Sequence, residues 1–265
     1  MPDAELPLLR WVDAGALGVE VAVTTRRGGV SRAPYDSLNL GLHVGDDPAD
    51  VAVNRRLAAG AFGVELSRLV FARQVHGAGV AVVGGVDAGR GTTADDDAVA
   101  DADVLVTATP GVALVIMVAD CVPLALVDER AGVLAVVHAG WRGTAAGVAG
   151  AALDAMVERG AARGRIRAWM GPAVAPEGYQ VTDEVRHALD DAAGASALDP
   201  DVARPDGPGH WLVDLVAANR QQLRLGDVRA GHITSCGVTT ADERFFSDRA
   251  ARPCGRFALL ARLVG

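Results

Sequence analysis

The chain has 265 residues and a net charge of −8 at neutral pH, and half of its residues are hydrophobic. This length can bury a large core, and the negative balance argues against a general nucleic-acid binder, which would display a basic surface. The chain has no apolar stretch of the roughly 18–20 residues that a membrane span needs, and residues 1–10 contain no apolar segment of a secretory signal. We therefore expect a cytoplasmic protein that has no membrane partner.

All 25 basic residues are arginine. Without lysine, the chain cannot form a Schiff base, hold pyridoxal phosphate covalently or place a P-loop lysine on a nucleotide. The three cysteines, Cys121, Cys236 and Cys254, include no CxxC pair. An odd number of widely spaced cysteines indicates reduced thiols rather than a disulfide framework.

The N-terminal third predicts a strand followed by a helix. Val19–Thr25 is an apolar, β-branched run, and Gly28-Gly29 supplies the turn that ends it. Asp47 followed by Pro48 has the pattern of an N-cap and a first helical residue. We expect the helix to run from there to about Gly60.

The central part of the chain predicts a buried strand and then a hairpin. Val112–Ala119 is a continuous valine-rich run, which is typical of a strand covered on both faces. Leu124–Val127 and Val133–Val137 predict two strands joined by a turn over 128–132. The hairpin should bring Cys121, before its first strand, close to His138, which ends its second.

The remaining segments alternate between strand and helix patterns. We expect strands at Val80–Val83, Ile166–Met170, His232–Ser235 and Phe257–Leu263, and helices at Thr144–Arg159, Thr182–Asp191 and Trp211–Leu225. The acidic segment 91–103 should be a solvated loop, because its run Asp95–Asp97 lacks the ligand spacing of a calcium site. The alternation predicts a mixed α/β (α+β) fold with β-sheets flanked by helices, in one domain over residues 1–265.

Three side chains at strand edges could hold a metal. His76 and His138 each lie between an apolar strand pattern and a glycine, where backbone approaches a site closely, whereas His187, His210 and His232 have ordinary surroundings. Cys121 could be a positioned thiolate or a small buried hydrophobe. Two imidazoles and one thiolate would leave the fourth tetrahedral position of zinc open, as in catalytic sites.

Several segments, in this order, resemble the YfiH/YlmD-type laccase-domain family. They are Thr24–Ser31, Tyr35–Gly41, Asn54-Arg55, Gln74–Gly77, Ala119–Cys121 and His138–Gly143. This family is described both as multicopper polyphenol oxidase (laccase) and as purine nucleoside phosphorylase of the laccase-domain type. One departure from its pattern is near the C-terminus, where Asp248 and Ala250 replace a tyrosine and an arginine and Gly237 replaces a threonine. Substrate contacts from that segment are therefore in doubt.

The resemblance implies a zinc ion held by His76, Cys121 and His138, with Arg55 at the substrate or phosphate. It implies phosphorolysis of adenosine, inosine, guanosine and methylthioadenosine, and deamination of adenosine. Asn39, which lies in a matching segment, and Arg142 are further candidates for substrate binding, although Arg142 could instead buttress its loop. We expect Asp120 to transfer a proton or to support a metal-bound imidazole, although it could equally cap a turn.

Three alternatives stay open. Cys121 could be a nucleophile with His138 as its base in a metal-independent hydrolase or amidase. The chain could instead be a non-enzymatic metal-binding module. A copper-dependent polyphenol oxidase is the third, since copper can replace zinc on such ligands. By resemblance to known multicopper oxidases, however, a three-copper cluster needs roughly eight further histidines, and this chain has four outside the proposed site.

Overall fold

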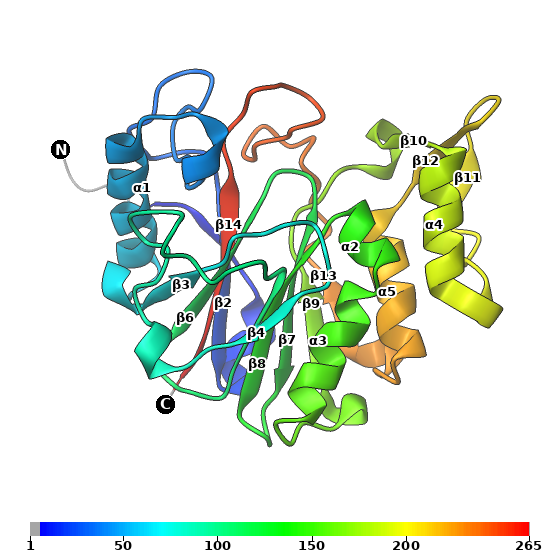
Figure 1. Cartoon of the computed structure of the whole chain (residues 1–265), viewed down its shortest axis with the longest axis horizontal. Coiled ribbons are helices and arrows are strands. Elements are labelled where there is room, and N and C mark those ends of the chain that lie inside the picture. The colour runs from blue at the N-terminus through cyan, green and yellow to red at the C-terminus, as the bar shows by residue number, and fades with distance from the viewer. Residues whose placement is uncertain (1–5, 265) are drawn as a thin grey trace.

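The structure is a computed structural model that describes residues 6–264 (Figure 1). Residues 1–5 and 265, at the ends of the expected 1–265 domain, lie outside the described residues. The five-stranded sheet has the order β1 (Leu8–Arg10), β2 (Val19–Thr24), β14 (Phe257–Leu263), β6 (Ala113–Val118) and β3 (Leu69–Phe71). The six-stranded sheet has the order β13 (Ile233–Ser235), β9 (Arg167–Met170), β7 (Val122–Asp128), β8 (Val133–Ala139), β5 (Val104–Thr107) and β4 (Val80–Val82).

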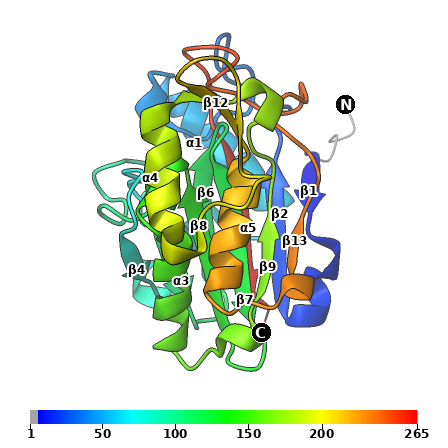
Figure 2. The same ribbon diagram turned by 90° about the vertical axis from the view of Figure 1, so that its right-hand side faces the viewer.

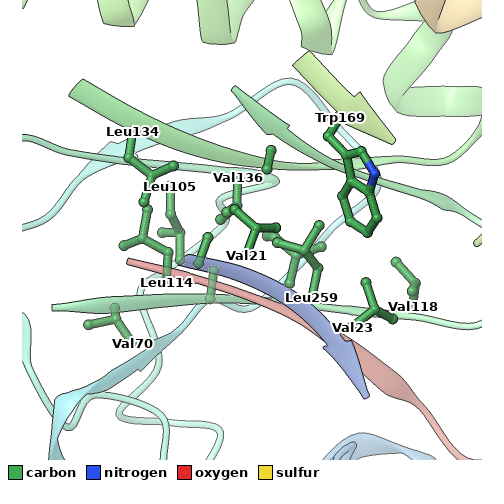
Figure 3. Packing of buried hydrophobic residues seen from close by; sticks show 14 of the residues in the cluster. Val21, Val23, Val70, Leu105, Leu114, Val118, Leu134, Val136, Trp169 and Leu259 are labelled. Carbon is green, nitrogen blue, oxygen red and sulfur yellow. The ribbon is translucent and has the colours of Figure 1, made fainter. Parts of the chain in front are cut away.

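The two large sheets pack face to face and bury a common core (Figure 3). Alternate residues of β6 show why: Leu114, Ile116 and Val118 face the other sheet. Their neighbours on the same strand point to the opposite face, where they pack against helix α1 (Pro48–Ala61). Both faces of β6 are thus covered, which explains its continuous apolar sequence.

Helices cover the outer faces of both sheets. Helix α1 lies on the five-stranded sheet through Ala58, Ala59 and Phe62. Helices α3 (Val148–Val157) and α5 (Leu215–Leu225) lie over the six-stranded sheet, as Figure 2 shows. The order helix, sheet, sheet, helix confirms the predicted mixed α/β (α+β) class.

A smaller sheet lies beside the helical layer. It contains β10 (Gln180–Thr182), β12 (His210–Val213) and β11 (Ala203–Pro205), next to helix α4 (Asp183–Ala193). Among residues 6–264, no helix is long and apolar enough to cross a bilayer.

Several sequence predictions are confirmed. The Asp47 carboxylate caps α1 by accepting from the Ala49 N–H at 2.8 Å. In the β7–β8 hairpin Pro123 lies opposite His138. Cys121, just before β7, is therefore close to His138 near the end of β8. The predicted strands before Met170 and at the C-terminus match β9 and β14 to within one residue.

The predicted helix 144–159 is wrong in its continuity. The chain forms two helices, α2 (Trp141–Ala145) and α3, separated by Ala146 and Gly147. Gly147 has a φ of 76°, and a left-handed residue cannot continue a right-handed helix.

The predicted helix 211–225 begins too early. Residues 210–213 form β12, which pairs antiparallel with β10 and β11, and α5 begins only after Asp214. The Asp214 carboxylate caps the helix by accepting from the Ala217 N–H at 2.9 Å.

The expected solvated loop 91–103 is solvated only in part, mainly over residues 93–97, and both of its ends are buried. Asp96 and Asp97 are exposed, but Val99 is buried and forms a parallel bridge with Ala72, beyond the end of β3. Asp103, the last residue of the loop, is completely buried. The loop therefore carries one acidic side chain into the interior.

Core packing between the sheets gives the first prediction. Leu114→Ala should lower the free energy of unfolding by about 2–5 kcal/mol, because Leu114 is fully buried between two rigid layers. Urea denaturation measures this loss of unfolding free energy, provided that the dependence of the free energy on urea concentration (the m value) stays the same. Leu57→Ala in α1, where Leu57 is 41% exposed, is the matched control and should cost less than about 1 kcal/mol. Equal losses in the two variants would contradict this account of the core.

Candidate metal centre

His76, Cys121 and His138 converge at the open end of the β7–β8 hairpin. One potential ligand atom from each lies within 4.8 Å of the others. The ring centroids of the two histidines are 4.7 Å apart, with the planes at 77°. His138 is buried, Cys121 is half-buried and His76 is exposed. The group is therefore held by the core on one side and reaches solvent on the other.

Gly140 leaves the space that this convergence requires. A Cβ atom at Gly140 would lie 2.8 Å from the Cys121 Sγ and 3.2 Å from the His76 Cδ2. Both contacts are with side chains of the triplet, so any larger residue would push the donor atoms apart. The glycine that follows the end of β8 is thus part of the site.

The buried Asp103 carboxylate fixes both histidines. Its Oδ1 lies 2.7 Å from the His138 Nδ1, which leaves Nε2 for the centre. The same carboxylate accepts backbone N–H bonds from Val75, His76 and Gly77 at 3.3, 3.0 and 2.7 Å. The carboxylate behind the His138 imidazole is therefore Asp103; such support was one of the roles that the sequence left open for Asp120.

The His76 backbone is held in an unfavourable conformation. Its φ is 61°, which costs a residue with a Cβ about 1–2 kcal/mol. Besides the bonds from Asp103, the loop is tied to β6 by Gln74, whose amide donates to the Met117 carbonyl at 2.7 Å and accepts from the Met117 N–H at 2.8 Å. These contacts hold in place the backbone that carries the His76 imidazole.

The side chains of His76, Cys121 and His138 shift one another's pKa values through their charges and hydrogen bonds. Burial alone would raise the pKa of the Cys121 thiol, but the charge and hydrogen bond of His138, with a further hydrogen bond from His76, lower it. Burial alone would lower the pKa of His138, and the Cys121 thiolate and the Asp103 carboxylate raise it instead. Cys121 is thus favoured as a thiolate, the form that binds metals and attacks electrophiles.

Asp120 connects the Cys121 turn to the C-terminal part of the chain. Its Oδ1 accepts from the Thr240 hydroxyl at 2.5 Å, and its Oδ2 accepts from the Arg249 N–H at 2.6 Å. Its backbone carbonyl accepts from the Val174 N–H. Both carboxylate oxygens are therefore engaged in joining segments, which is closer to the turn-capping alternative than to support of an imidazole.

Arg55 lies buried among backbone carbonyls. Its Nε donates to Leu40 at 2.8 Å, its Nη1 donates to Gly91 and Thr92, and its guanidinium lies 4.0 Å from the Phe71 ring centroid. Only 1% of its surface is exposed. Burial lowers its pKa to about 10, which still leaves it charged at neutral pH.

Asn39 is also completely buried. Its Oδ1 accepts from the backbone N–H groups of Gly41 and Arg256, and its Nδ2 donates to the Gly41 carbonyl and to the Asp46 carboxylate. The structure thus places Asn39, like Arg55, in the framework that holds loops together. Neither side chain is brought to the exposed side of the His76–Cys121–His138 group.

Arg142 is the one predicted substrate residue that is exposed. It is the second residue of α2, four residues beyond His138, and its guanidinium lies 4.4 Å from the ring centroid of Trp141. Tyr179, which the sequence analysis did not single out, is half-buried and shares a charge environment with Cys121, Asp120 and Arg142.

The divergent C-terminal segment is held by its own ion pairs. Asp248, which stands where the family pattern has tyrosine, pairs with Arg252 at 2.6 Å and with Arg256 at 3.3 Å. Cys236 and Cys254 are free thiols, as expected, and Cys254 is buried. The substitution is thus accommodated inside the segment.

A family model described as multi-copper polyphenol oxidoreductase laccase matches residues 20–264. The chain belongs to this family. It is 44% identical over 255 residues to a Mycobacterium tuberculosis protein named purine nucleoside phosphorylase, with 94% of each chain covered.

Two solved structures share the fold along nearly the whole chain. The crystal structure of YlmD from Geobacillus stearothermophilus aligns with a TM-score of 0.93 at 36% identity, covering 100% of this chain and 98% of that one. The crystal structure of the Bacillus licheniformis hypothetical protein YfiH gives 0.92 at 32% identity, with 99% and 98% covered. The resemblance read from the sequence is confirmed.

The family description mentions several coppers, and the side chains can be counted against it. Across residues 6–264, His76, Cys121 and His138 form the one group of three or more acidic, histidine or cysteine side chains with metal-binding geometry. His210 and His232 instead hold backbone carbonyls through Nδ1. The described residues therefore offer ligands for one ion, and the soft thiolate with two imidazoles suits zinc or copper.

Asp103 gives the second prediction. Asp103→Asn should weaken zinc binding about 10- to 100-fold, because the amide neither balances the imidazole charge nor accepts all four hydrogen bonds. Competition with a chromophoric chelator measures the affinity. Asp101→Asn is the matched control, since the Asp101 side chain is exposed and, among residues 6–264, forms an ion pair with Arg73 alone. An affinity unchanged in Asp103→Asn would show that the carboxylate does not orient the ligands.

Gly140 gives the third prediction. Gly140→Ala should weaken zinc binding about tenfold or more, because the added methyl group would contact the Cys121 sulfur and displace it. A loss of this size is typical when the residues around metal ligands are changed. Gly150→Ala is the control: it lies in α3 with nothing within 4 Å of the added Cβ, and it should stabilise the fold by up to about 1 kcal/mol. Full zinc affinity in Gly140→Ala would mean that the three ligands do not need this close approach.

Proposed function

We propose that this chain is a zinc-dependent purine nucleoside phosphorylase. The observation that carries the proposal is the convergence of two imidazoles and one thiolate within 4.8 Å, with His76 open to solvent. Support also comes from the M. tuberculosis relative, which is named purine nucleoside phosphorylase. The reaction is attack of a phosphate oxygen on the anomeric carbon of the nucleoside, with cleavage of the bond to the purine nitrogen.

His76, Cys121 and His138 would hold the zinc ion, which when bound supplies a Lewis acid for developing negative charge. The residues of the chain provide the rest. Asp103 keeps the His138 Nε2 directed at the centre, and the Asp103 and Gln74 contacts hold the His76 loop. In this proposal substrates approach from the exposed side of His76, and the exposed Arg142, four residues beyond His138, is the guanidinium that would bind phosphate.

Arg55 has a different role in this proposal from the one the resemblance implies. With three donors on backbone carbonyls and 1% exposure, it keeps the segments around Leu40 and Gly91 in place instead of touching substrate. Asn39 acts with it as a framework residue. Asp120 likewise holds the C-terminal segment against the Cys121 turn.

The same centre is proposed to deaminate adenosine, in which water attacks C6 of the purine and the amino group leaves as ammonia, giving inosine. Inosine, guanosine and methylthioadenosine are the further expected substrates of phosphorolysis. Both reactions develop negative charge that a Lewis acid and nearby hydrogen-bond donors stabilise in a partly desolvated site. The same site could therefore serve both.

A second candidate function has a specific observation in its favour. Asp103, His138 and Cys121 form a line of carboxylate, imidazole and thiol in which the pKa of Cys121 is lowered. That order is the arrangement of a cysteine hydrolase, in which the imidazole removes the thiol proton and the carboxylate orients the imidazole. Dependence on metal separates the two candidates.

Product analysis gives the fourth prediction. Purified protein incubated with adenosine should release adenine only when phosphate is present, and inosine with or without phosphate, by chromatography. A chelator and His76→Ala should both abolish these products, since each removes the metal. His187→Ala, an exposed histidine of α4, should leave turnover unchanged. Intact adenosine in every sample would reject the proposal, and metal-independent amide hydrolysis would favour the thiol mechanism.

A further inference from the structure

Helix α2 packs against the segments that carry the candidate ligands. It follows β8 with one residue between them, Gly140. A Cβ atom at Gly140 would lie 2.8 Å from the Cys121 Sγ. A Cβ atom at Gly143, inside α2, would lie 2.9 Å from the Gly77 carbonyl oxygen. The two glycines thus let the helix lie in direct contact with the thiol and with the loop that carries His76.

Thr144 joins α2 to the neighbouring helix α5. It is completely buried, and its N–H donates to the Gly140 carbonyl at 2.8 Å. Its hydroxyl oxygen accepts from the Asn219 Nδ2 at 3.0 Å, and its carbonyl accepts from the Gln222 Nε2 at 2.6 Å. Asn219 and Gln222 both belong to α5, which lies beside α2 (Figure 1). Two amides of α5 therefore hold both the side chain and the backbone of one α2 residue.

The oxygen ends of these two amides have no such use. Within residues 6–264, three buried side-chain polar atoms have no hydrogen-bond partner, and they are the Asn219 Oδ1, the Gln222 Oε1 and the Arg186 Nε. The orientation of the Asn219 amide is fixed, because its Nδ2 also donates to the Leu215 carbonyl at 2.9 Å. A buried amide with an unpaired oxygen gives the fold less than one that is bonded at both ends. The bonds to Thr144 are thus the main interactions that the two amides share.

We propose that Asn219 and Gln222 are positioning residues of the metal centre. By holding Thr144 they keep α2 in place, and α2 keeps the Cys121 thiol and the His76 loop at the separation that one ion requires. Among the described residues, neither amide forms a hydrogen bond with a ligand side chain, so the effect passes through the helix. The inference rests on the proposed function for the presence of the ion.

The test replaces both partners of one bond by apolar side chains of similar shape, Thr144→Val together with Asn219→Leu. Such a paired replacement is nearly neutral for stability, so the midpoint of urea unfolding should stay close to that of the unmodified chain. The zinc affinity, measured by competition with a chromophoric chelator, should fall about tenfold or more. The visible spectrum of cobalt(II) bound in place of zinc should change as well, because it depends on the ligand geometry.

Two single changes check this result. Thr144→Ser keeps the hydroxyl oxygen that accepts from Asn219, and it should retain the zinc affinity of the unmodified chain. Gln222→Met removes the second amide at a half-buried position, which the fold should tolerate, and it should weaken zinc binding. If the double variant does not fold, Gln222→Met alone decides.

Gln221→Met is the matched control, because Gln221 is a buried amide of the same helix. Its side chain accepts from the Asp199 N–H at 3.0 Å and donates to the Ala197 carbonyl. Within residues 6–264 it forms no hydrogen bond with α2. Its replacement should lower the urea midpoint and leave the zinc affinity and the cobalt spectrum unchanged.

The outcomes separate this inference from the proposed function. Unchanged zinc affinity in the folded double variant and in Gln222→Met would overturn the positioning role, as would an equal loss in Gln221→Met. These measurements need no nucleoside, so a chain that shows the expected losses but leaves adenosine intact keeps the positioning role and loses the phosphorylase proposal.

A metal-free measurement covers the case in which the unmodified chain binds no zinc. The proposed metal would then fail, and the rate at which iodoacetamide alkylates Cys121, followed by mass spectrometry, would test the positioning role. The rate should rise in the double variant, because Gly140 would no longer lie against the sulfur. A rate equal to that of the unmodified chain would overturn the inference.

Discussion

The four hydrogen bonds that converge on the Asp103 carboxylate are the constraint on which the rest of the site depends. A buried carboxylate is costly unless its oxygens are satisfied, and here they are satisfied only when β8 and the His76 loop are both in place. The end of β5, the imidazole of His138 and the backbone of His76 are therefore coupled. The hydrogen bonds that satisfy the Asp103 carboxylate are thus the same ones that position His76 and His138.

Other buried polar groups do the same work around the centre. Asp120 joins the Cys121 turn to Thr240 and Arg249, and Arg55 joins the segments around Leu40 and Gly91. The segments that they connect have little regular structure, so few backbone ladders could hold them. The two-sheet core supplies a rigid base, and single buried side chains fix the irregular segments on it.

What could be predicted from the sequence was local. The Cys121–His138 pair could be found because one hairpin carries both residues, and hairpin pairing follows from a short turn between apolar strands. Asp103 was missed because its role depends on β5 pairing with β8, a contact across about thirty residues that no periodicity reveals.

The surroundings of Arg55 and Trp211 could not be predicted from the sequence, for related reasons. A helix pattern places Arg55 on α1. It does not show that the carbonyl groups of Leu40, Gly91 and Thr92 surround the side chain. Trp211 precedes a capped helix, and only its pairing with Val181 and Pro205 makes it a strand residue. In each case the deciding partner is far away in the sequence.

The unequal burial of the three ligands has a kinetic consequence. Cys121 and His138 are anchored to the two strands of a hairpin that is buried along its whole length, whereas His76 is exposed and belongs to a short loop. An ion held by all three would leave only when that loop gives up its hydrogen bonds to Asp103 and Met117, and the hairpin can stay folded meanwhile. The rate of metal exchange would then be set by a local opening, independent of the much slower unfolding of the core.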